Sequence, residues 1–306
     1  MRIFNKIMAM ITGLLICGLY VAAASGEEAL KFKHITSIYA DGQGLGLRHP
    51  EGVACDRDSA LFIADTGNAR ILQYVYKDNA VAAEPRVIKL PQLVYPGRIK
   101  LNSRNDIFVL DGKRRRIVRI GSSGKFAGYI DLQGSSSATA AIPQSFNIDK
   151  KDNIYILDVY SRRVVMLDPR GKYLKDFRFS REHGFITDLT VDFKGNILLI
   201  DSVNAKVFSN TGKSAAFIPI TESLKEYMRF PTAIATDRMG RIYLVDRNGG
   251  RIIIVDQHGG YLGRLSTMGW KEGLLNYPAQ ICLNDSGEIF VADTNNSRVQ
   301  IFSIIE

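Results

Sequence analysis

An aspartate is followed five positions later by a basic residue at six places in the chain, each after an apolar run. The pairs are Asp65/Arg70, Asp111/Arg116, Asp158/Arg163, Asp201/Lys206, Asp246/Arg251 and Asp293/Arg298. A carboxylate and a cation at this spacing can pair across a tight turn, and Asp also accepts amide hydrogens of such turns. Six equivalent copies indicate turn architecture rather than catalysis, with each half-exposed pair contributing ~0.2–1 kcal/mol.

The spacing of these aspartates indicates the fold. They lie 46, 47, 43, 45 and 47 residues apart, and short runs such as 61–64, 154–157 and 289–292 are rich in Ile, Val, Phe and Tyr. Such runs between Gly, Asn and Asp are typical of strands. A period near 45 residues fits a four-stranded propeller blade. The sequence therefore predicts an all-β, six-bladed propeller of four-stranded antiparallel blades.

Several segments resemble the NHL repeat. Asp65–Ile71 and Asp293–Val299 resemble the end of that repeat, and Gly44–Pro50 and Gly273–Pro278 resemble its inlet. On these motifs the chain is identified as a member of the NHL-repeat six-bladed propellers, of the bacterial exported kind. The fourth unit departs most, with Ile186 at the inlet proline position and Lys206 as its basic residue. The resemblance implies the fold and says little about activity, because propellers host many functions.

One apolar strand, residues 32–39, precedes the first inlet proline, and the last repeat stops after its third strand, residues 299–303. We expect the N-terminal strand to complete the last blade, because this closure covers an otherwise open sheet edge. Residues 25–306 are then a single propeller domain.

Residues 1–24 have the pattern of a secretory signal peptide. Arg2 and Lys6 are followed by the uncharged run 7–24, which ends in Ala22–Ala24. The alternative is an uncleaved membrane anchor, since 18 uncharged residues are just enough to span a bilayer. We expect an exported protein, periplasmic or extracellular, without a membrane span in its mature chain.

After cleavage Cys55 and Cys282 remain, on the inner strands of the neighbouring first and last blades. Their opposite strand parity means that they either face each other or both face away, so a disulfide and two free thiols both stay open.

Basic residues gather where a propeller's inlet loops and post-aspartate turns share one face. The candidate binding residues are Arg98, Lys100, Lys113, Arg114, Arg115, Tyr160 and Arg162. Arg114, the third residue after Asp111, stands where other units place Asn, Gly or Ser, so turn chemistry does not explain it. With a net charge of +9, such a face favours an acidic protein or an anionic polymer. Nucleic acid is not expected for an exported chain. The expected function is a protein-binding or scaffold module without catalytic residues or cofactor, and the alternative is a solvated basic turn.

An enzyme is the competing interpretation. Amidating lyases, which the fold resembles, place zinc-binding His residues just after the inlet prolines. The corresponding positions here are Glu51, Gly97, Gln144, Thr187, Thr232 and Ala279, none of which is His. Glu51-Gly52 resembles the opening of gluconolactonase-like propellers, which implies Glu51 as a metal ligand. Asn147 and Asp188 would then be further oxygen ligands, suited to Ca²⁺. A metal-dependent lactonase-like hydrolase or a lyase is therefore the alternative function, and the oligomeric state stays open.

Overall fold

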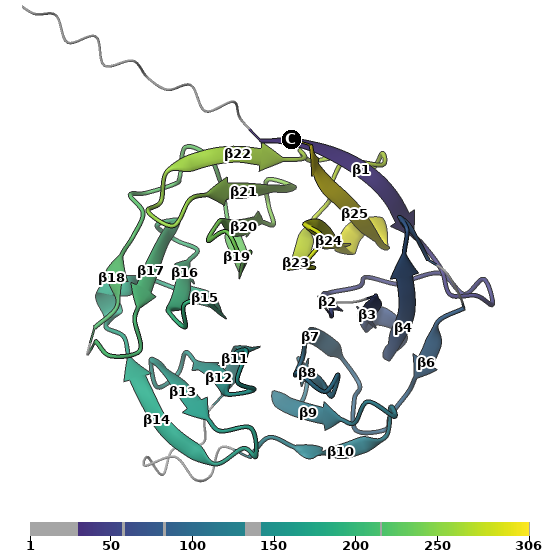
Figure 1. The fold of residues 1–306 in the computed structure, drawn as a ribbon, viewed down its shortest axis with the longest axis horizontal. Helices are drawn as coiled ribbons and strands as arrows, with labels where there is room; N and C mark the ends of the chain where they lie inside the picture. Colours follow the sequence, from purple (N-terminus) through teal and green to yellow (C-terminus); the bar gives the residue numbers. More distant parts are fainter. Residues whose placement is uncertain (1–29, 57–58, 82–83, 132–141, 215, 306) are drawn as a thin grey trace, which may run out of the picture.

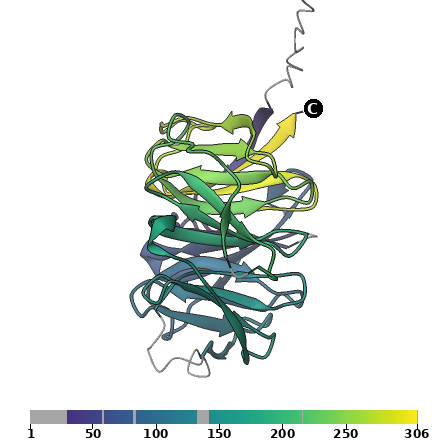
Figure 2. The ribbon, with the colours of Figure 1, turned by 90° about the vertical axis from the view of Figure 1, so that its left-hand side faces the viewer.

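Six sheets stand around a central channel like the blades of a propeller (Figure 1). The computed structural model describes residues 30–56, 59–81, 84–131, 142–214 and 216–305. The expected signal peptide or anchor, residues 1–24, lies outside these residues. The predicted all-β, six-bladed architecture is confirmed, and blades two to five pair their strands antiparallel in chain order from the channel outward. Figure 2 shows the ring from its side.

The blades have the following strands. Blade one contains β2 (Gly52–Cys55), β3 (Ala60–Asp65), β4 (Arg70–Lys77), β5 (Ala80–Val81) and β6 (Arg86–Ile88); blade two contains β7 (Pro96–Leu101), β8 (Ile107–Asp111), β9 (Arg116–Ile120) and β10 (Phe126–Tyr129). Blade three contains β11 (Pro143–Ile148), β12 (Ile154–Asp158), β13 (Arg163–Leu167) and β14 (Tyr173–Arg178); blade four contains β15 (Ile186–Val191), β16 (Ile197–Asp201), β17 (Lys206–Asn210) and β18 (Ile218–Pro219). Blade five contains β19 (Pro231–Thr236), β20 (Ile242–Asp246), β21 (Arg251–Val255) and β22 (Tyr261–Leu265); blade six contains β23 (Pro278–Leu283), β24 (Glu288–Asp293), β25 (Arg298–Ile305) and β1 (Lys31–Ile38). Short 3-10 turns occupy η1 (Thr66–Asn68), η2 (Arg181–His183) and η3 (Thr294–Asn296).

The core lies between the blades. Every residue of the second strands β8, β12, β16 and β20 is buried, because successive side chains point to opposite faces and each face packs on a neighbouring blade. One such layer joins Tyr243 and Val245 of blade five to Ile289 and Val291 of blade six. Continuous apolar runs therefore replace the polar–apolar alternation of a sheet that faces water on one side.

Two devices close the ring at the junction of blades one and six. The expected N-terminal strand closure is confirmed, since β1 pairs antiparallel with β25 from Lys31 opposite Ile305 to Ile38 opposite Val299. A disulfide joins Cys55 of β2 to Cys282 of β23, whose Cα atoms lie 6.1 Å apart. The two cysteines thus face each other, which was one of the two arrangements that their parity allowed.

The repeated aspartates position the inlet loops. All six have an exposed fraction of 0%, so the expectation of half-exposed pairs was wrong. Each carboxylate accepts a backbone N–H from the loop that enters its blade, and these donors are Arg48, Val94, Ile142, Phe185, Phe230 and Asn276 at 2.6–3.4 Å. Their interpretation as turn architecture is confirmed by these contacts.

Only some of the basic partners form the ion pair. Four pairs lie at 2.6–3.1 Å: Asp65–Arg70, Asp158–Arg163, Asp246–Arg251 and Asp293–Arg298. In the described residues Asp111 and Asp201 form no ion pair with Arg116 and Lys206. Each of these two aspartates instead accepts four N–H groups from loop and turn, such as Lys113 and Arg114 on Asp111, which leaves no acceptor position for the cation.

Candidate functional site

The turn between β8 and β9 carries four consecutive basic residues, Lys113–Arg116, and all four are exposed. We call it the basic turn. It lies on the inlet face, the side of the ring that carries the inlet loops and the turns after the repeated aspartates. Buried Asp111 accepts the backbone N–H groups of Lys113 at 3.0 Å and Arg114 at 2.9 Å. These bonds fix the backbone of the turn, so its side chains project toward solvent.

No side chain of the basic turn is paired with a carboxylate in the described residues. Instead Lys113 lies 5.9 Å from the Tyr95 ring centre, Arg116 lies 5.4 Å from that of Tyr129, and Arg114 donates to the carbonyl of Pro91 at 2.9 Å. Contacts with rings and a carbonyl orient the side chains and leave their positive charge uncompensated. The turn is therefore a local source of positive potential on the inlet face.

Arg115 occupies the left-handed position of this turn, with φ at 51°. The corresponding residue of blade three is Arg162, with φ at 50°, whereas the other four turns use Ala69, Ala205, Gly250 and Ser297. The left-handed residue is thus the fourth after the aspartate, one position after Arg114 and its equivalents. The left-handed conformation costs an L-residue ~1–2 kcal/mol, and the two arginines adopt it as the small residues do.

A pocket of about 220 Å³ opens beside the basic turn at the mouth of the channel. We call it the mouth pocket. Its lining residues are Glu51, Gly97, Arg98, Leu110, Asp111, Gly112, Arg115, Pro143 and Gln144. Of the candidate binding residues, Arg98 and Arg115 thus lie around one cavity. Glu51 accepts a hydrogen bond from the Tyr95 hydroxyl at 2.9 Å. Burial, reinforced by this bond, raises the pKa of Tyr95 and keeps it a neutral donor.

Arg98 also crosses the channel. Its guanidinium donates to Asp188 at 3.0 Å and to the carbonyl of Thr232 at 2.6 Å, so it joins blade two to blades four and five. Asp188 accepts further hydrogen bonds from the Ser145 hydroxyl and, at 2.9 Å, from the backbone N–H of Ile234. Both oxygens of Asp188 are thereby engaged, and its charge is neutralised by Arg98.

A second link across the channel joins blades six and two. The Gln280 side chain donates to the carbonyl of Ile99 at 3.0 Å and accepts the Ile99 N–H at 3.2 Å. Sequence reasoning missed Gln280, although the repeats contain a signal for it. Gln280, Arg98, Ser145 and Asp188 all stand two positions after their inlet residue, and this register faces the channel.

Comparisons with known proteins agree with the architecture. The family model described as NHL repeat matches residues 275–302, which include β23, β24 and part of β25. The chain is a six-bladed propeller that carries an NHL repeat.

Solved structures share the fold of this six-bladed propeller at low identity. A streptogramin B lyase is 11% identical with a TM-score of 0.62, over 91% of this chain and 99% of that one. A gluconolactonase from Xanthomonas campestris is 13% identical with a TM-score of 0.64, over 90% of both chains. A Bacteroides thetaiotaomicron protein of unknown function is 14% identical with a TM-score of 0.68, over 90% of this chain and 76% of that one. A search of curated protein sequences found no match. Likeness at this identity shows the fold alone.

Lys100 lies deeper in the channel, and its side-chain amine forms no hydrogen bond in the described residues. Burial lowers the pKa of Lys100 below its usual value; neighbouring Asp188 opposes this shift and Arg98 reinforces it. The folded protein therefore disfavours the charged form of the Lys100 side chain.

The three suggested Ca²⁺ ligands have separate partners. Glu51 accepts from Tyr95, Asp188 is paired with Arg98, and Asn147 donates to the Thr190 hydroxyl at 3.2 Å. Within the described residues no group of three or more His, Cys, Asp or Glu side chains is placed to hold a metal ion. The described chain also contains no helix with the length and apolar character needed to cross a bilayer.

The two candidate residues on blade three lie apart from the mouth pocket. Tyr160 has an exposed fraction of 72% and Arg162 is half-buried, on the turn between β12 and β13. Neither lines the mouth pocket. Of the seven residues predicted for binding, Arg98 and Arg115 line the mouth pocket. Lys113 and Arg114 precede Arg115 on the basic turn, and Lys100 lies below in the channel.

Proposed function

We propose that this NHL propeller is an exported binding module that holds an acidic protein segment on its inlet face at blade two. The observation that carries the proposal is the basic turn, whose four consecutive exposed cations have no carboxylate partner among the described residues. Arginine forks bind carboxylates through two parallel hydrogen bonds, so exposed Arg114 and Arg115 suit an acidic partner. A binding module of this kind requires no cofactor.

The adjoining mouth pocket supports the same site. Arg98 and Arg115 contribute cations to its lining, although the charge of Arg98 is neutralised by Asp188 and Glu51 adds a carboxylate. One acidic side chain of a bound segment fits beside Arg115 here, while neighbouring acidic side chains contact the rest of the basic turn.

Export is supported by the Cys55–Cys282 disulfide, since disulfides persist mainly in oxidising compartments. The N-terminal sequence pattern of a positively charged start and an apolar run points the same way.

The enzyme alternative has weaker support. Lyases and a gluconolactonase share the fold, but at 11–13% identity that likeness does not extend to a reaction. The suggested ligands Glu51, Asn147 and Asp188 each bind a different neighbour, and Arg98 already supplies the positive charge beside Asp188.

Labelled poly-L-glutamate is a defined acidic probe for the proposed site. The triple variant Lys113→Ser, Arg114→Ser, Arg115→Asn should weaken its binding by about tenfold, because three rim charges contribute ~0.3–1 kcal/mol each. Asn is chosen at 115 because it tolerates the left-handed conformation. Binding to the unmodified protein should also weaken when salt is raised from about 50 to about 200 mM.

The control is a second triple variant, Lys151→Ser, Arg170→Ser, Lys172→Ser, which removes three exposed charges from turns on the other face of blade three. Fluorescence anisotropy should show nearly unchanged binding for this control. Equal losses in the two triple variants would mean that net charge alone attracts the probe and would refute the inlet-face site.

A further inference from the structure

On the face opposite the inlet loops, the return face, blades meet at turns between their first and second strands. Hydrogen bonds at or near these turns join most neighbours: Asn105–Asp56 at 3.1 Å, Ser103–Asp152 at 2.7 Å, Lys150–Phe193 at 3.3 Å, Arg238–Asp285 at 2.5 Å and Tyr76–Glu288 at 2.9 Å. The seam between blades four and five is different. Among the described residues no hydrogen bond joins its turns, 192–196 and 237–241.

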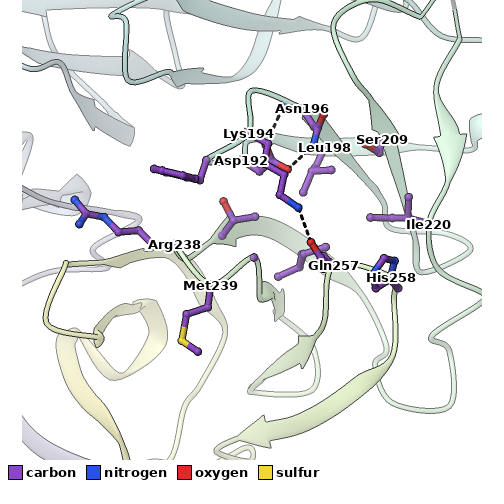
Figure 3. A pocket seen from close by; sticks show the side chains of 14 residues that line it. Asp192, Lys194, Asn196, Leu198, Ser209, Ile220, Arg238, Met239, Gln257 and His258 are labelled. Carbon is purple, nitrogen blue, oxygen red and sulfur yellow. Dashed lines mark hydrogen bonds between the residues drawn. The ribbon is translucent and has the colours of Figure 1, made fainter.

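Lys194 spans this seam in another way. Its ammonium donates at 2.8 Å to Oε1 of Gln257, which lies on the turn between β21 and β22 at the outer side of blade five (Figure 3). Beneath this bridge the two blades separate and leave a pocket of about 460 Å³. We call it the seam pocket. A volume of this size is typical of sites for small molecules.

The lining of the seam pocket combines apolar side chains with polar ones such as Ser209, Thr236 and His258. The apolar ones include Leu198 and Ile242, which are 3% and 2% exposed, and half-buried Ile220. At its opening the lining residues Phe193 and Met239 are 57% and 76% exposed, so large apolar side chains surround the entrance. An apolar body in the pocket would contact the buried side chains and remove exposed surface of Phe193 and Met239 from water, which favours binding by ~25 cal/mol per Å² of apolar area buried.

The outer end of the pocket is closed by backbone packing. Gly259 lies so near blade four that a Cβ atom at this position would be 2.3 Å from the carbonyl oxygen of Ile220. The left-handed φ of Gly259, 88°, also favours glycine. The two blades touch here, and the lining residues from turns 192–196 and 237–241 place the opening of the seam pocket on the return face.

Lys194 supplies a cation at the entrance that can bind an anion. Lys194 bonds only to the neutral Gln257 amide and forms no ion pair in the described part of the chain. The charge of Arg238 is neutralised by Asp285, whereas the Asp192 carboxylate bonds to the neutral Asn196 within its own turn and keeps its negative charge. Among the described lining residues, Lys194 is therefore a cation without an ion-pair partner, and its ammonium can exchange the Gln257 amide for a carboxylate.

We propose that the seam pocket binds a small molecule with an apolar body and one carboxylate. The body packs against Leu198, Ile220 and Ile242, and the carboxylate pairs with Lys194 in place of the Gln257 amide. This site lies on the face opposite the basic turn, so it is independent of the proposed acidic partner and has its own set of variants.

The test uses two probes that differ in charge and hardly in shape, 1-naphthylacetate and 1-naphthylacetamide, in isothermal titration calorimetry. The acid should bind at one site and more tightly than the amide. Lys194→Met should weaken the acid by about three- to fivefold, the effect of one exposed charge contact, and leave the amide unchanged. Lys151→Met, an exposed lysine on the return face of blade three, is the matched control and should change neither probe.

A second variant tests the cavity itself. Ser209 lines the seam pocket, and Ser209→Phe should fill it and abolish binding of both probes. If thermal unfolding shows that this variant is not folded, Met239→Asp replaces it, because Met239 is exposed and a carboxylate there should repel the acid alone. Three results would overturn the proposal: no saturable binding of the acid, equal affinity for acid and amide, or acid binding that survives both Lys194→Met and the cavity variant.

Discussion

Arg298 should be among the most costly side chains of this protein to remove, although it is far from the proposed sites. Its side chain is 3% exposed and donates to Asp293 at 2.7 Å, to the carbonyls of Lys271 and Leu274 at 2.7 and 2.8 Å, and to the Tyr39 hydroxyl at 3.2 Å. It therefore ties the loop that enters blade six to the aspartate turn and to the chain that follows β1.

The magnitude follows from what the substitution Arg298→Met leaves behind. Breaking a buried ion pair costs ~3–5 kcal/mol, because one charge stays buried without its partner. Asp293 would keep the Asn276 N–H and the side chains of Asn296 and Gln300, which places the cost at the lower end. The carbonyls of Lys271 and Leu274 would each lose the Arg298 bond but keep another donor, the Leu274 N–H and the Gln300 side chain, so they add little to the cost. We expect a loss of ~3–4 kcal/mol in the free energy of unfolding.

Arg116→Met is the matched control, since Arg116 has the same place in its repeat but is exposed and not paired with Asp111. Its loss removes only the contact with the Tyr129 ring and should cost ~0.5–1 kcal/mol. Urea unfolding would be followed by circular dichroism and by fluorescence of Trp270, the one tryptophan, which lies in the loop that Arg298 holds. Coincident transitions by the two probes justify a single free energy.

Arg298→Lys adds a finer test, because it keeps the charge but not the forked geometry, and should fall between the unmodified protein and Arg298→Met. If Arg298→Met and Arg116→Met cost the same, or if Arg298→Met costs less than ~1 kcal/mol, burial does not set the strength of these pairs and the reasoning fails.

Three further outcomes follow from the fold. Removal of β1 should reduce hydrogen-exchange protection of Ile289–Ile301 in blade six, and a loss confined to blade one would contradict the closure. Replacing Cys55 and Cys282 by Ala should cost ~2–4 kcal/mol in urea unfolding; combined with removal of β1 the loss should exceed the sum, since both close one junction, and additive losses would argue against this. Lys100→Met should raise the free energy of unfolding at about pH 7, because burial lowers the pKa of Lys100 in the folded state. Between the lowered pKa of the folded state and the usual pKa of about 10.4, the unfolded chain binds more protons than the folded chain. The free energy of unfolding of the unmodified protein therefore rises with pH in this range. The stability advantage of Lys100→Met should shrink accordingly.

The repeat pattern by itself determined the architecture, for a local reason. A strand, a tight turn and the next strand are specified by residues close together in the sequence, such as Asp293 and Arg298, and the period sets the size of each blade. Ring closure by β1 was also predictable, because a ring of blades leaves one strand missing at one end and one extra at the other. The exposed basic turn followed from its composition in the same way, since four consecutive cations are rarely buried.

Only the tertiary structure decided what meets across the ring. Arg98 and Asp188 lie 90 residues apart in the sequence, and their contact depends on the radius of the channel. The pairing of Cys55 with Cys282 depends on how two neighbouring blades are rotated toward each other, which strand parity restricts to two arrangements without choosing one. The seam pocket lies where no hydrogen bond joins turns 192–196 and 237–241 in the described chain, a property of the packing of whole blades. Whether such contacts form depends on the packing of many residues from several blades, whereas a repeat motif describes one blade at a time.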